Sequence, residues 1–316
     1  MKSYAPILIP TLNRYAHFQR CIVSLSKCTG AGDTDLIVAL DYPLKESHWE
    51  GYRLIKDYLL TIGGGFKSLT VIERSENYGA VRNYLESMDY VFSKYKNVVF
   101  TEDDNEFSPN FLEFLNAGLS AFESDARVQA VCGYKLPIND HLIKNKEERH
   151  FFFAKTFSAW GYATWRDRYL NRRKLMSSLE VYEYLFKKNN LRDIYSMAPK
   201  KVLSLLANIK NKKELYGDSI FSLDNIENGT YCLFPTLSKV RNFGHDGSGA
   251  NCGVVKDSIH QRTVVDERST IDIVHRDRDD FDCNYAKLIA SYYKLSIRDY
   301  ASIPHLLISA CFRVRR

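Results

Sequence analysis

The chain has 316 residues, of which 45% are hydrophobic and 26% charged, so it has the composition of a globular protein and room for one large α/β domain or two smaller ones. Its net charge of +6 favours contact with phosphates or an anionic membrane face, but it is too small to indicate a nucleic-acid groove, and we expect no nucleic-acid partner. The seven cysteines include no C-x-x-C pair, which argues against a disulfide framework or a structural zinc site and favours reduced thiols in a cytoplasmic protein.

The N-terminal apolar run is too short for the hydrophobic region of a signal peptide, and no stretch reaches the length of a membrane span. From this run onward, apolar stretches alternate with amphipathic ones. We expect strands at residues 6–11, 35–41 and 69–73, and helices at residues 18–26, 52–60 and 77–92. This alternation predicts an α/β fold with a mostly parallel sheet and helices on both of its faces.

Three adjacent carboxylates follow the next apolar run. Residues 98–100 read as a buried strand and lead directly into Glu102, Asp103 and Asp104. Such a cluster is costly unless it is solvated or neutralised, and Mg²⁺ is typically bound by one or two carboxylates together with substrate phosphates. Ser108 as cap and Pro109 as first helical residue then predict a helix over residues 110–122. The alternative is an exposed acidic turn that caps this helix.

Polar residues also follow the other predicted strands. Because the carboxyl ends of parallel strands meet at one edge of a sheet, where ligands bind in open α/β folds, we expect these residues to outline a crevice with the acidic cluster. They are Thr11, Asn13 and Arg14 after the first strand, Asp41 after the second, and Asn77, Gly79 and Arg82 after the third.

Together these features resemble the GT-A-fold glycosyltransferases. The resemblance rests on Pro-Ile-Leu-Ile-Pro-Thr-Leu-Asn-Arg at residues 6–14, on Asp41, on the turn at residues 77–83, and on the acidic stretch with the helix start that follows it. The acidic stretch resembles N-acetylglucosaminyltransferase I enzymes, and the chain as a whole resembles bacterial surface-polysaccharide transferases of the family 2 type, over about residues 5–250.

The resemblance implies roles for the crevice residues. A Mn²⁺ or Mg²⁺ ion would bind the diphosphate of a nucleotide sugar, with Asp104 as its direct protein ligand. Glu102 or Asp103 would face the ribose and the sugar. The remaining residues would bind the donor, with the first four lining the nucleoside: Thr11, Asn13, Arg14, Asp41, Asn77, Gly79 and Arg82.

The second half of the chain begins with expected strands at residues 128–137 and 151–153. In the transferases that this chain resembles, a Trp-Gly segment at the place of Trp160 and Gly161 packs under the donor sugar and the acceptor. The alternative is that Trp160 and Trp165 are core residues. Residues 166–213 are strongly basic, which indicates either a solvated helix face or a surface for an anionic or lipid-pyrophosphate acceptor.

Asp218 stands just before a predicted helix, so it is either an N-cap or a functional carboxylate. Related transferases carry an aromatic-Asp pair here, although this sequence inserts Gly217 between Tyr216 and Asp218. Inverting sugar transfer needs one carboxylate to accept the proton of the acceptor hydroxyl, and we assign that role to Asp218, with Asp224 as the alternative.

The last motif is a glycine-rich loop at residues 242–249 that resembles a loop of bacterial relatives. The resemblance makes His245 a candidate second metal ligand, while Asp246 or the loop backbone could equally face the diphosphate. Beyond it, residues 282–297 and 303–316 have amphipathic patterns. The final segment ends in Arg313, Arg315 and Arg316, and it reads either as a helix packed on the domain or as a peripheral anchor on anionic membrane.

We therefore predict a GT-A domain at residues 1–250, with a nucleotide-sugar-binding half (1–125) and an acceptor-side half (126–250), followed by a helical extension at 251–316. The predicted activity is metal-dependent, inverting transfer of a hexosyl or N-acetylhexosaminyl group from a nucleotide sugar, with UDP favoured, to a glycan or lipid-linked glycan in bacterial surface-polysaccharide biosynthesis. The predicted location is the cytoplasm, including the inner face of the plasma membrane. The alternatives are a sugar nucleotidyltransferase, which would normally carry a glycine-rich signature after the first strand, and a non-catalytic glycan- or nucleotide-binding protein.

Overall fold

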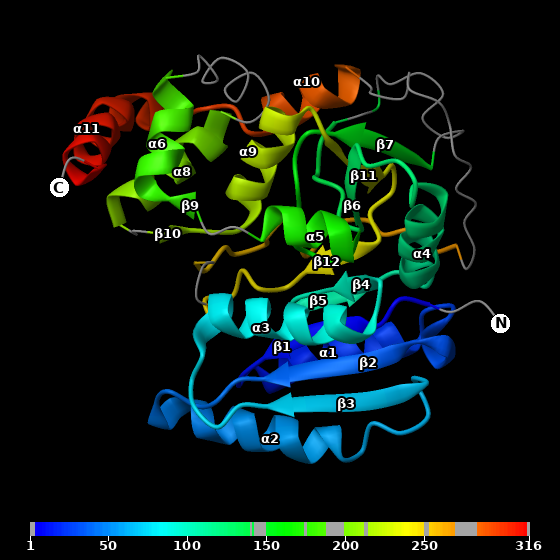
Figure 1. The fold of residues 1–316 in the computed structure, drawn as a ribbon. Helices are drawn as coiled ribbons and strands as arrows, with labels where there is room; N and C mark the ends of the chain where they lie inside the picture. The colour runs from blue at the N-terminus through cyan, green and yellow to red at the C-terminus, as the bar shows by residue number, and fades with distance from the viewer. Residues whose placement is uncertain are drawn as a thin grey trace.

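The computed structural model describes residues 4–139, 141, 150–173, 176–187, 199–211, 214–249, 253–268 and 283–314. Its centre is an eight-stranded sheet with the strand order β3-β2-β1-β4-β8-β6-β11-β7 (Figure 1). The strands are β1 (Ile7–Thr11), β2 (Asp35–Leu40), β3 (Ser68–Glu73), β4 (Asn97–Phe100), β6 (Val128–Cys132), β7 (Phe151–Ala154), β8 (Tyr162–Trp165) and β11 (Tyr231–Pro235).

Neighbouring strands are parallel from β3 through β2 and β1 to β4, and again between β6 and β11, while β8 and β7 pair antiparallel with their neighbours. The predicted fold class, a mostly parallel α/β sheet flanked by helices, is confirmed. The antiparallel strand β8 lies within the segment that we examined only for its Trp-Gly motif, and it was not expected as a strand.

Alternation along the strands separates two cores. On one face, Ile7 and Ile9 pack with helices α1 (Tyr15–Ser26), α2 (Trp49–Leu59) and α4 (Phe111–Ala121). On the other face, Leu8 packs with α3 (Gly79–Lys94), α9 (Asp218–Asn228) and α10 (Cys283–Tyr292). Both faces of the sheet are therefore covered, which explains the near-continuous apolar runs of its central strands.

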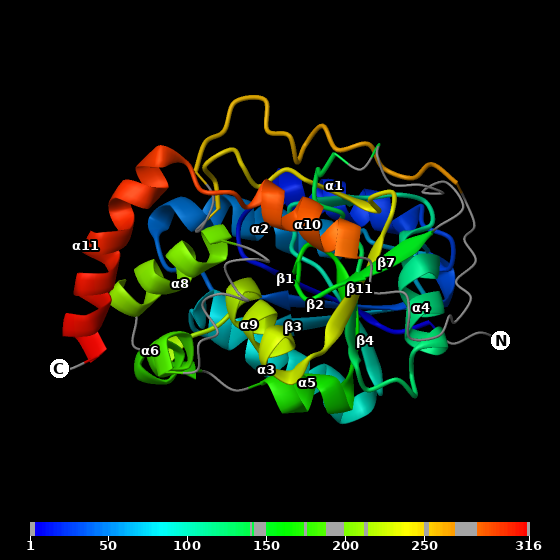
Figure 2. The ribbon, with the colours of Figure 1, turned by 90° about the horizontal axis from the view of Figure 1, so that it is seen from above.

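A third apolar cluster lies beside the sheet, where α6 (Ser178–Lys187), α8 (Pro199–Asn211) and α11 (Ile297–Val314) pack together against α9 (Figures 1 and 2). The described residues also form two short antiparallel sheets: β9 (Met176–Ser177) with β10 (Glu214–Leu215), and β5 (Asn105–Phe107) with β12 (Val240–Asn242). The other helices within the described ranges are α5 (Arg166–Arg172) and two short 3-10 turns, η1 (Ala31–Asp33) and η2 (Glu46–His48). In the part of the chain that is described, no helix combines the length and apolarity needed to cross a bilayer.

Two local predictions were wrong. Helix α4 begins at Phe111 with Asn110 as N-cap, and no side chain bonds to its first turn. Ser108 instead donates to Asn110 Oδ1 at 2.9 Å, because the chain first forms β5 before it turns into the helix. The strand expected at residues 128–137 ends at Cys132. At the C-terminus, Ile297–Val314 forms one helix that contains Pro304, and the preceding helix ends at Tyr292.

Candidate active site

The carboxylates of Asp103 and Asp104 are buried and are held by residues from the first strand and the turn after it. Thr11 Oγ1 donates to Asp103 Oδ2 at 2.7 Å. The guanidinium of Arg14 bridges both carboxylates, with Nη2 bound to Asp103 Oδ1 and Nη1 at 2.8 Å from Asp104 Oδ2. The contact arises because β1 and β4 are parallel neighbours, so their carboxyl ends lie together. The sequence analysis grouped Thr11 and Arg14 with the acidic cluster, and in the structure both residues contact it directly.

The other oxygen of Asp104 is held from the far end of the chain. Asn242 Nδ2 donates to Asp104 Oδ1 at 2.8 Å and to Asn105 Oδ1 at 3.0 Å, because β12 pairs with β5 in the register Asn242 opposite Asn105. Gly244 follows, and a Cβ built there would lie 2.3 Å from Asp104 Oδ2. Only glycine therefore leaves the space beside this oxygen open.

The donor set suits a hard divalent cation that is bound partly by its substrate. Oxygen ligands and the open space at Gly244 favour Mg²⁺ or Mn²⁺ at Asp104, since such ions commonly take only one or two carboxylates together with phosphates. Among the described residues, no three His, Cys, Asp or Glu side chains gather as a complete ligand cluster. In the structure both aspartates pair with Arg14, a residue that the sequence analysis placed beside the nucleoside.

The carboxylates in the crevice are strongly coupled. Burial raises the pKa of Asp103, and Asp104 adds to the effect, while the charge of Arg14 opposes it. Burial also raises the pKa of Glu102 well above its usual range, and the negative charges of Asp104 and Asp218 raise it further. Glu102 therefore interacts electrostatically with both Asp104 and Asp218.

A second set of hydrogen bonds links Asp41 with Asn77 and Gly79. Asp41 Oδ1 accepts from the backbone nitrogens of Tyr42 and Tyr78, and Oδ2 accepts from Gly79 N at 2.9 Å. Asn77 Nδ2 donates to Tyr42 O at 2.6 Å. The carboxylate thus stabilises the N-terminus of α3, where an anion is favourable.

Two predicted donor residues lie at the margin of this arrangement. The side chain of Arg82 is 51% exposed, pairs with Glu76 and Glu86, and stacks on the ring of Tyr78. Asn13 is partly buried in the turn that follows β1. Neither has a contact with the acidic cluster among the hydrogen bonds of the described residues.

Trp160 and Gly161 pack at the other side of the crevice. The indole of Trp160 contacts the rings of Tyr134, His245 and His260, with centroid distances of 4.7, 5.7 and 5.0 Å. Gly161 has a positive φ of 70°, and a Cβ there would meet Phe111 at 2.9 Å, so this turn needs glycine. Trp165 is a core residue that is 2% exposed and donates to Leu119 O at 3.3 Å.

His245 stacks on His260, and the ring centroids are 4.7 Å apart. His245 Nδ1 is buried without a hydrogen-bond partner among the described residues, which leaves a nitrogen available for a ligand. His260 accepts from or donates to Tyr134 OH at 2.6 Å, and burial, with a smaller effect of His245, lowers its pKa to about 4. The imidazole that packs against the ring of His245 is therefore the neutral form of His260.

The exposed side chain of Asp246 binds His17 on α1. His17 Nε2 lies 2.8 Å from Asp246 Oδ2, and Ser248 donates to Asp246 Oδ1 through its backbone and its hydroxyl. These bonds lower the pKa of Asp246 well below the usual range despite partial burial. They fasten the glycine-rich loop to α1, next to Arg14.

Asp218 is the first residue of α9, and Gly217 rather than Asp218 is the N-cap. The N-cap alternative is therefore wrong. Asp218 Oδ2 accepts from the backbone nitrogen of Ala159 at 3.4 Å, which places the carboxylate beside the Trp160–Gly161 turn. Burial raises the pKa of Asp218, while the charge of Lys201 and the Ala159 bond act in the opposite direction. Asp224 lies nearly two turns further along α9, where it accepts from Asn228 Nδ2 at 3.0 Å.

Four residues at the site were missed: Asn242, Gly244, His260 and Lys201. Asn242 and Gly244 belong to the glycine-rich loop motif, so a closer reading of that motif could have indicated them. No local sequence pattern marks His260 as a site residue, because it lies in a turn. None marks Lys201 either, because it is one of many lysines in a basic segment.

No protein-family model matches the chain, and no curated protein matches it either. Solved structures with partial similarity include the mannosyltransferase PcManGT from Pyrobaculum calidifontis in complex with GDP-Man and Mn²⁺ (15% identity, 56% of this chain and 48% of that chain, TM-score 0.41). Two structures of S. aureus TarS also match. The first shows 14% identity over 56% of this chain and 31% of that chain, with a TM-score of 0.36, and the second, TarS 1-349, shows 12% identity over 54% and 48%, with a TM-score of 0.34. Less than two thirds of each of these chains is covered, and similarity at this level carries no argument about function.

Proposed function

We propose that this protein is an inverting glycosyltransferase that moves a sugar from a nucleotide-diphosphate sugar to a hydroxyl of a glycan acceptor. The observation that carries the proposal is the electrostatic interaction of Glu102 with two kinds of carboxylate. Asp103 and Asp104 lie at the carboxyl ends of the parallel strands, fixed by Thr11, Arg14 and Asn242, and Asp218, at the start of α9, interacts electrostatically with Glu102.

The donor side is the edge formed by β1, β4 and β12. A bound Mn²⁺ or Mg²⁺ would be held by Asp104, with His245 as a further candidate ligand, and would offset the charge of the leaving nucleotide diphosphate. Arg14 supplies a permanent positive charge beside the same carboxylates, and Gly244 keeps the approach to Asp104 Oδ2 free of side-chain atoms. These residues bind and orient the diphosphate in this proposal.

The acceptor side is the start of α9. Asp218 accepts the proton of the acceptor hydroxyl as the oxygen attacks the anomeric carbon. Its Oδ2 is oriented by Ala159 N, and partial burial raises its pKa, which makes the carboxylate a stronger base than an exposed aspartate. Trp160, fixed by Tyr134 and His260, offers an aromatic face next to this carboxylate.

The proposed cellular setting rests on the sequence resemblance and on the surface of α11. We place the enzyme in bacterial surface-polysaccharide biosynthesis, with a UDP-sugar as the favoured donor and a glycan or lipid-linked glycan as acceptor, following the sequence resemblance. Four exposed side chains of α11, Ile297, Tyr300, Ile308 and Phe312, lie on one side of the helix because of its 3.6-residue repeat. This apolar stripe supports peripheral contact with the cytoplasmic face of an anionic membrane.

The test is incubation of the purified protein with UDP-sugars and GDP-sugars, with and without Mn²⁺, while the release of nucleotide diphosphate is followed by chromatography. A glycosyltransferase hydrolyses its donor slowly without acceptor. A sugar nucleotidyltransferase would instead consume a nucleoside triphosphate with a sugar 1-phosphate, and a binding protein would turn over none of these compounds.

Two substitutions test the assigned roles. Asp218→Asn should lose about 10²- to 10⁴-fold in rate with unchanged donor affinity. Asp104→Ala should abolish transfer and weaken Mn²⁺-dependent nucleotide binding. Normal turnover in Asp218→Asn would move the base to Asp224, activity that persists in excess EDTA would exclude the metal, and a product with the donor's anomeric configuration would exclude inversion.

A further inference from the structure

A cavity adjoins Asp218, the candidate base. It has a volume of about 500 Å³ and lies where the first turns of α8 and α9 meet the end of α10. Its walls include Lys200, Lys201 and Ser204 from α8, Asp218 from α9, and Tyr292 and Tyr293. Small-molecule sites typically enclose about 300–1,000 Å³, so a sugar residue with a substituent fits this space.

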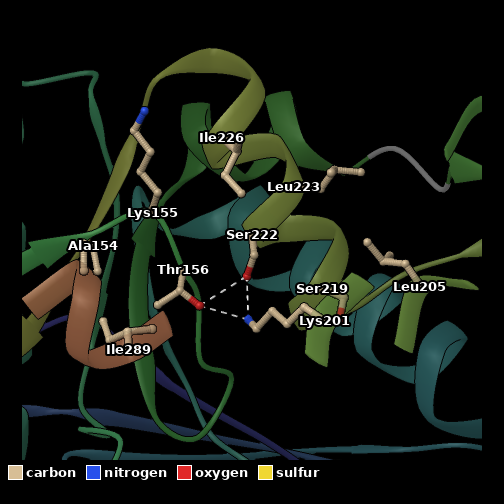
Figure 3. Close-up of a pocket in the computed structure, with 11 residues that line it drawn as sticks. Ala154, Lys155, Thr156, Lys201, Leu205, Ser219, Ser222, Leu223, Ile226 and Ile289 are labelled. Atoms are coloured by element: carbon tan, nitrogen blue, oxygen red, sulfur yellow. Dashed lines mark hydrogen bonds between the residues drawn. The ribbon is translucent and has the colours of Figure 1, made fainter. Parts of the chain in front are cut away.

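Lys201 is a buried cation without a matching carboxylate. The residue is 7% exposed, and its ammonium donates to Ser222 Oγ at 2.6 Å and Thr156 Oγ1 at 2.9 Å (Figure 3). It also donates to Phe157 O at 3.4 Å. All three acceptors are neutral, and within the described residues Lys201 forms no ion pair. Burial accordingly lowers its pKa, and Asp218 compensates only in part. An anion in the cavity would improve this charge balance.

Lys200 brings a second positive charge to the same wall. Its side chain is exposed, and its backbone nitrogen donates to Tyr293 O at 3.0 Å, which holds the start of α8 against the end of α10. The carboxylate of Asp299 on α11 is nearby but is engaged by Ser296, whose backbone nitrogen and hydroxyl both donate to Oδ2 at 2.7 Å. Asp218 is therefore the carboxylate that lines the cavity together with the two lysines.

Two further features of the walls suit an anionic sugar. The first turns of α8 and α9, helices of 13 and 11 residues, line the cavity, and the positive end of a helix dipole favours negative charge. The rings of Tyr292 and Tyr293 meet edge to face, 5.2 Å apart, and provide apolar surface for the C–H face of a sugar.

We propose that this cavity is a subsite for the acceptor and that it binds an anionic substituent, a phosphate or a carboxylate, on the acceptor's sugar residue. The anion is bound by Lys200 and is stabilised by the positive charge of the buried Lys201, and the sugar then presents a hydroxyl to Asp218. This inference rests on the proposed function for the identity of the acceptor, whereas the anion site itself can be tested without any transfer reaction.

The test is calorimetric or NMR titration of the intact protein, without donor or metal, with glucose, glucose 6-phosphate and glucuronate. We expect one or both anionic sugars to bind more tightly than glucose. Lys200→Gln should weaken anion binding about twofold to fivefold, the effect of one partly exposed charge, and leave glucose binding unchanged. The preference between phosphate and carboxylate identifies the substituent.

Lys210→Gln is the matched control, because Lys210 is exposed in the last turn of the same helix and does not line the cavity. Equal binding of glucose and both anions would overturn the proposal, as would equal weakening by Lys200→Gln and Lys210→Gln. Anion binding that depends on Lys200 in a protein that hydrolyses no nucleotide sugar would leave the subsite in place and overturn only the proposed function.

Discussion

Asn242 holds Asp104 from a position 138 residues further along the chain. Its side-chain nitrogen donates to Asp104 Oδ1 at 2.8 Å, and its side-chain oxygen accepts from Gly244 N at 3.1 Å. One amide thus fixes both the carboxylate at the end of β4 and the loop that passes over it. Residues that orient a metal-binding carboxylate in this way commonly matter almost as much as the ligand itself.

Replacing Asn242 by Ala should therefore weaken Mn²⁺ binding about 10- to 100-fold, because Asp104 loses the donor that orients it. Isothermal titration with Mn²⁺ in the presence of nucleotide diphosphate measures this. Arg241→Ala is the control, since Arg241 neighbours Asn242 on β12 but binds Thr263 O and Glu106 instead. Equal losses in both variants would indicate that damage to β12, and not the bond to Asp104, is responsible.

Gly244→Ala should be more damaging than its size suggests. Its Cβ would lie 2.3 Å from Asp104 Oδ2, so the carboxylate or the loop must move, and overpacking of this kind costs about 1–3 kcal/mol. Urea denaturation gives the free energy of unfolding, and the Mn²⁺ titration gives the effect on Asp104. Gly253→Ala meets no atom within 4 Å and should change stability by less than about 0.5 kcal/mol. Similar behaviour of the two variants would contradict the crowding at Gly244.

The pH dependence of the reaction should respond to Lys201. Asp218 works as a base only when ionised, burial raises its pKa, and the charge of Lys201 lowers it. Lys201→Met removes that charge, so the pKa of Asp218 rises and the acidic limb of kcat/KM moves to higher pH, with recovery of the rate on the alkaline side. A pH–rate profile measures both. Lys210→Met should leave the limb in place, and a uniformly lower rate without a shift would mean that Lys201 only supports packing.

Membrane contact through α11 predicts a selective loss of vesicle binding. Phe312→Ser and Ile308→Ser each remove an exposed apolar side chain, and because burying such a side chain is worth about 1.5–3 kcal/mol, partitioning should fall about tenfold or more. Co-sedimentation with vesicles that contain anionic phospholipid, at low salt, measures this. Leu60→Ser removes an even more exposed apolar side chain at the end of α2 and serves as control. Unchanged sedimentation of both α11 variants would exclude this face as the contact.

The local patterns of the chain predicted much of the first half. At β1, β2 and β4 an apolar run is followed directly by polar residues. Such a run indicates that a strand is present and where it ends. Thr11, Arg14, Asp103 and Asp104 could therefore be grouped before any contact was known. The acidic turn was also recognised, but its cap was misplaced, because Ser108 and Pro109 follow β5, whose existence depends on pairing with the distant β12.

The amino-acid sequence by itself determined the α/β class, the position of the acidic cluster and the candidate role of Asp218, since these depend on residue type and short-range order. Only the tertiary structure decided what surrounds them. Arg14 bridges Asp103 and Asp104, Asn242 orients Asp104, and Lys201 lies buried and lowers the pKa of Asp218. Each of these contacts joins segments far apart in the chain, and their geometry follows from strand register and helix packing, which no local pattern encodes.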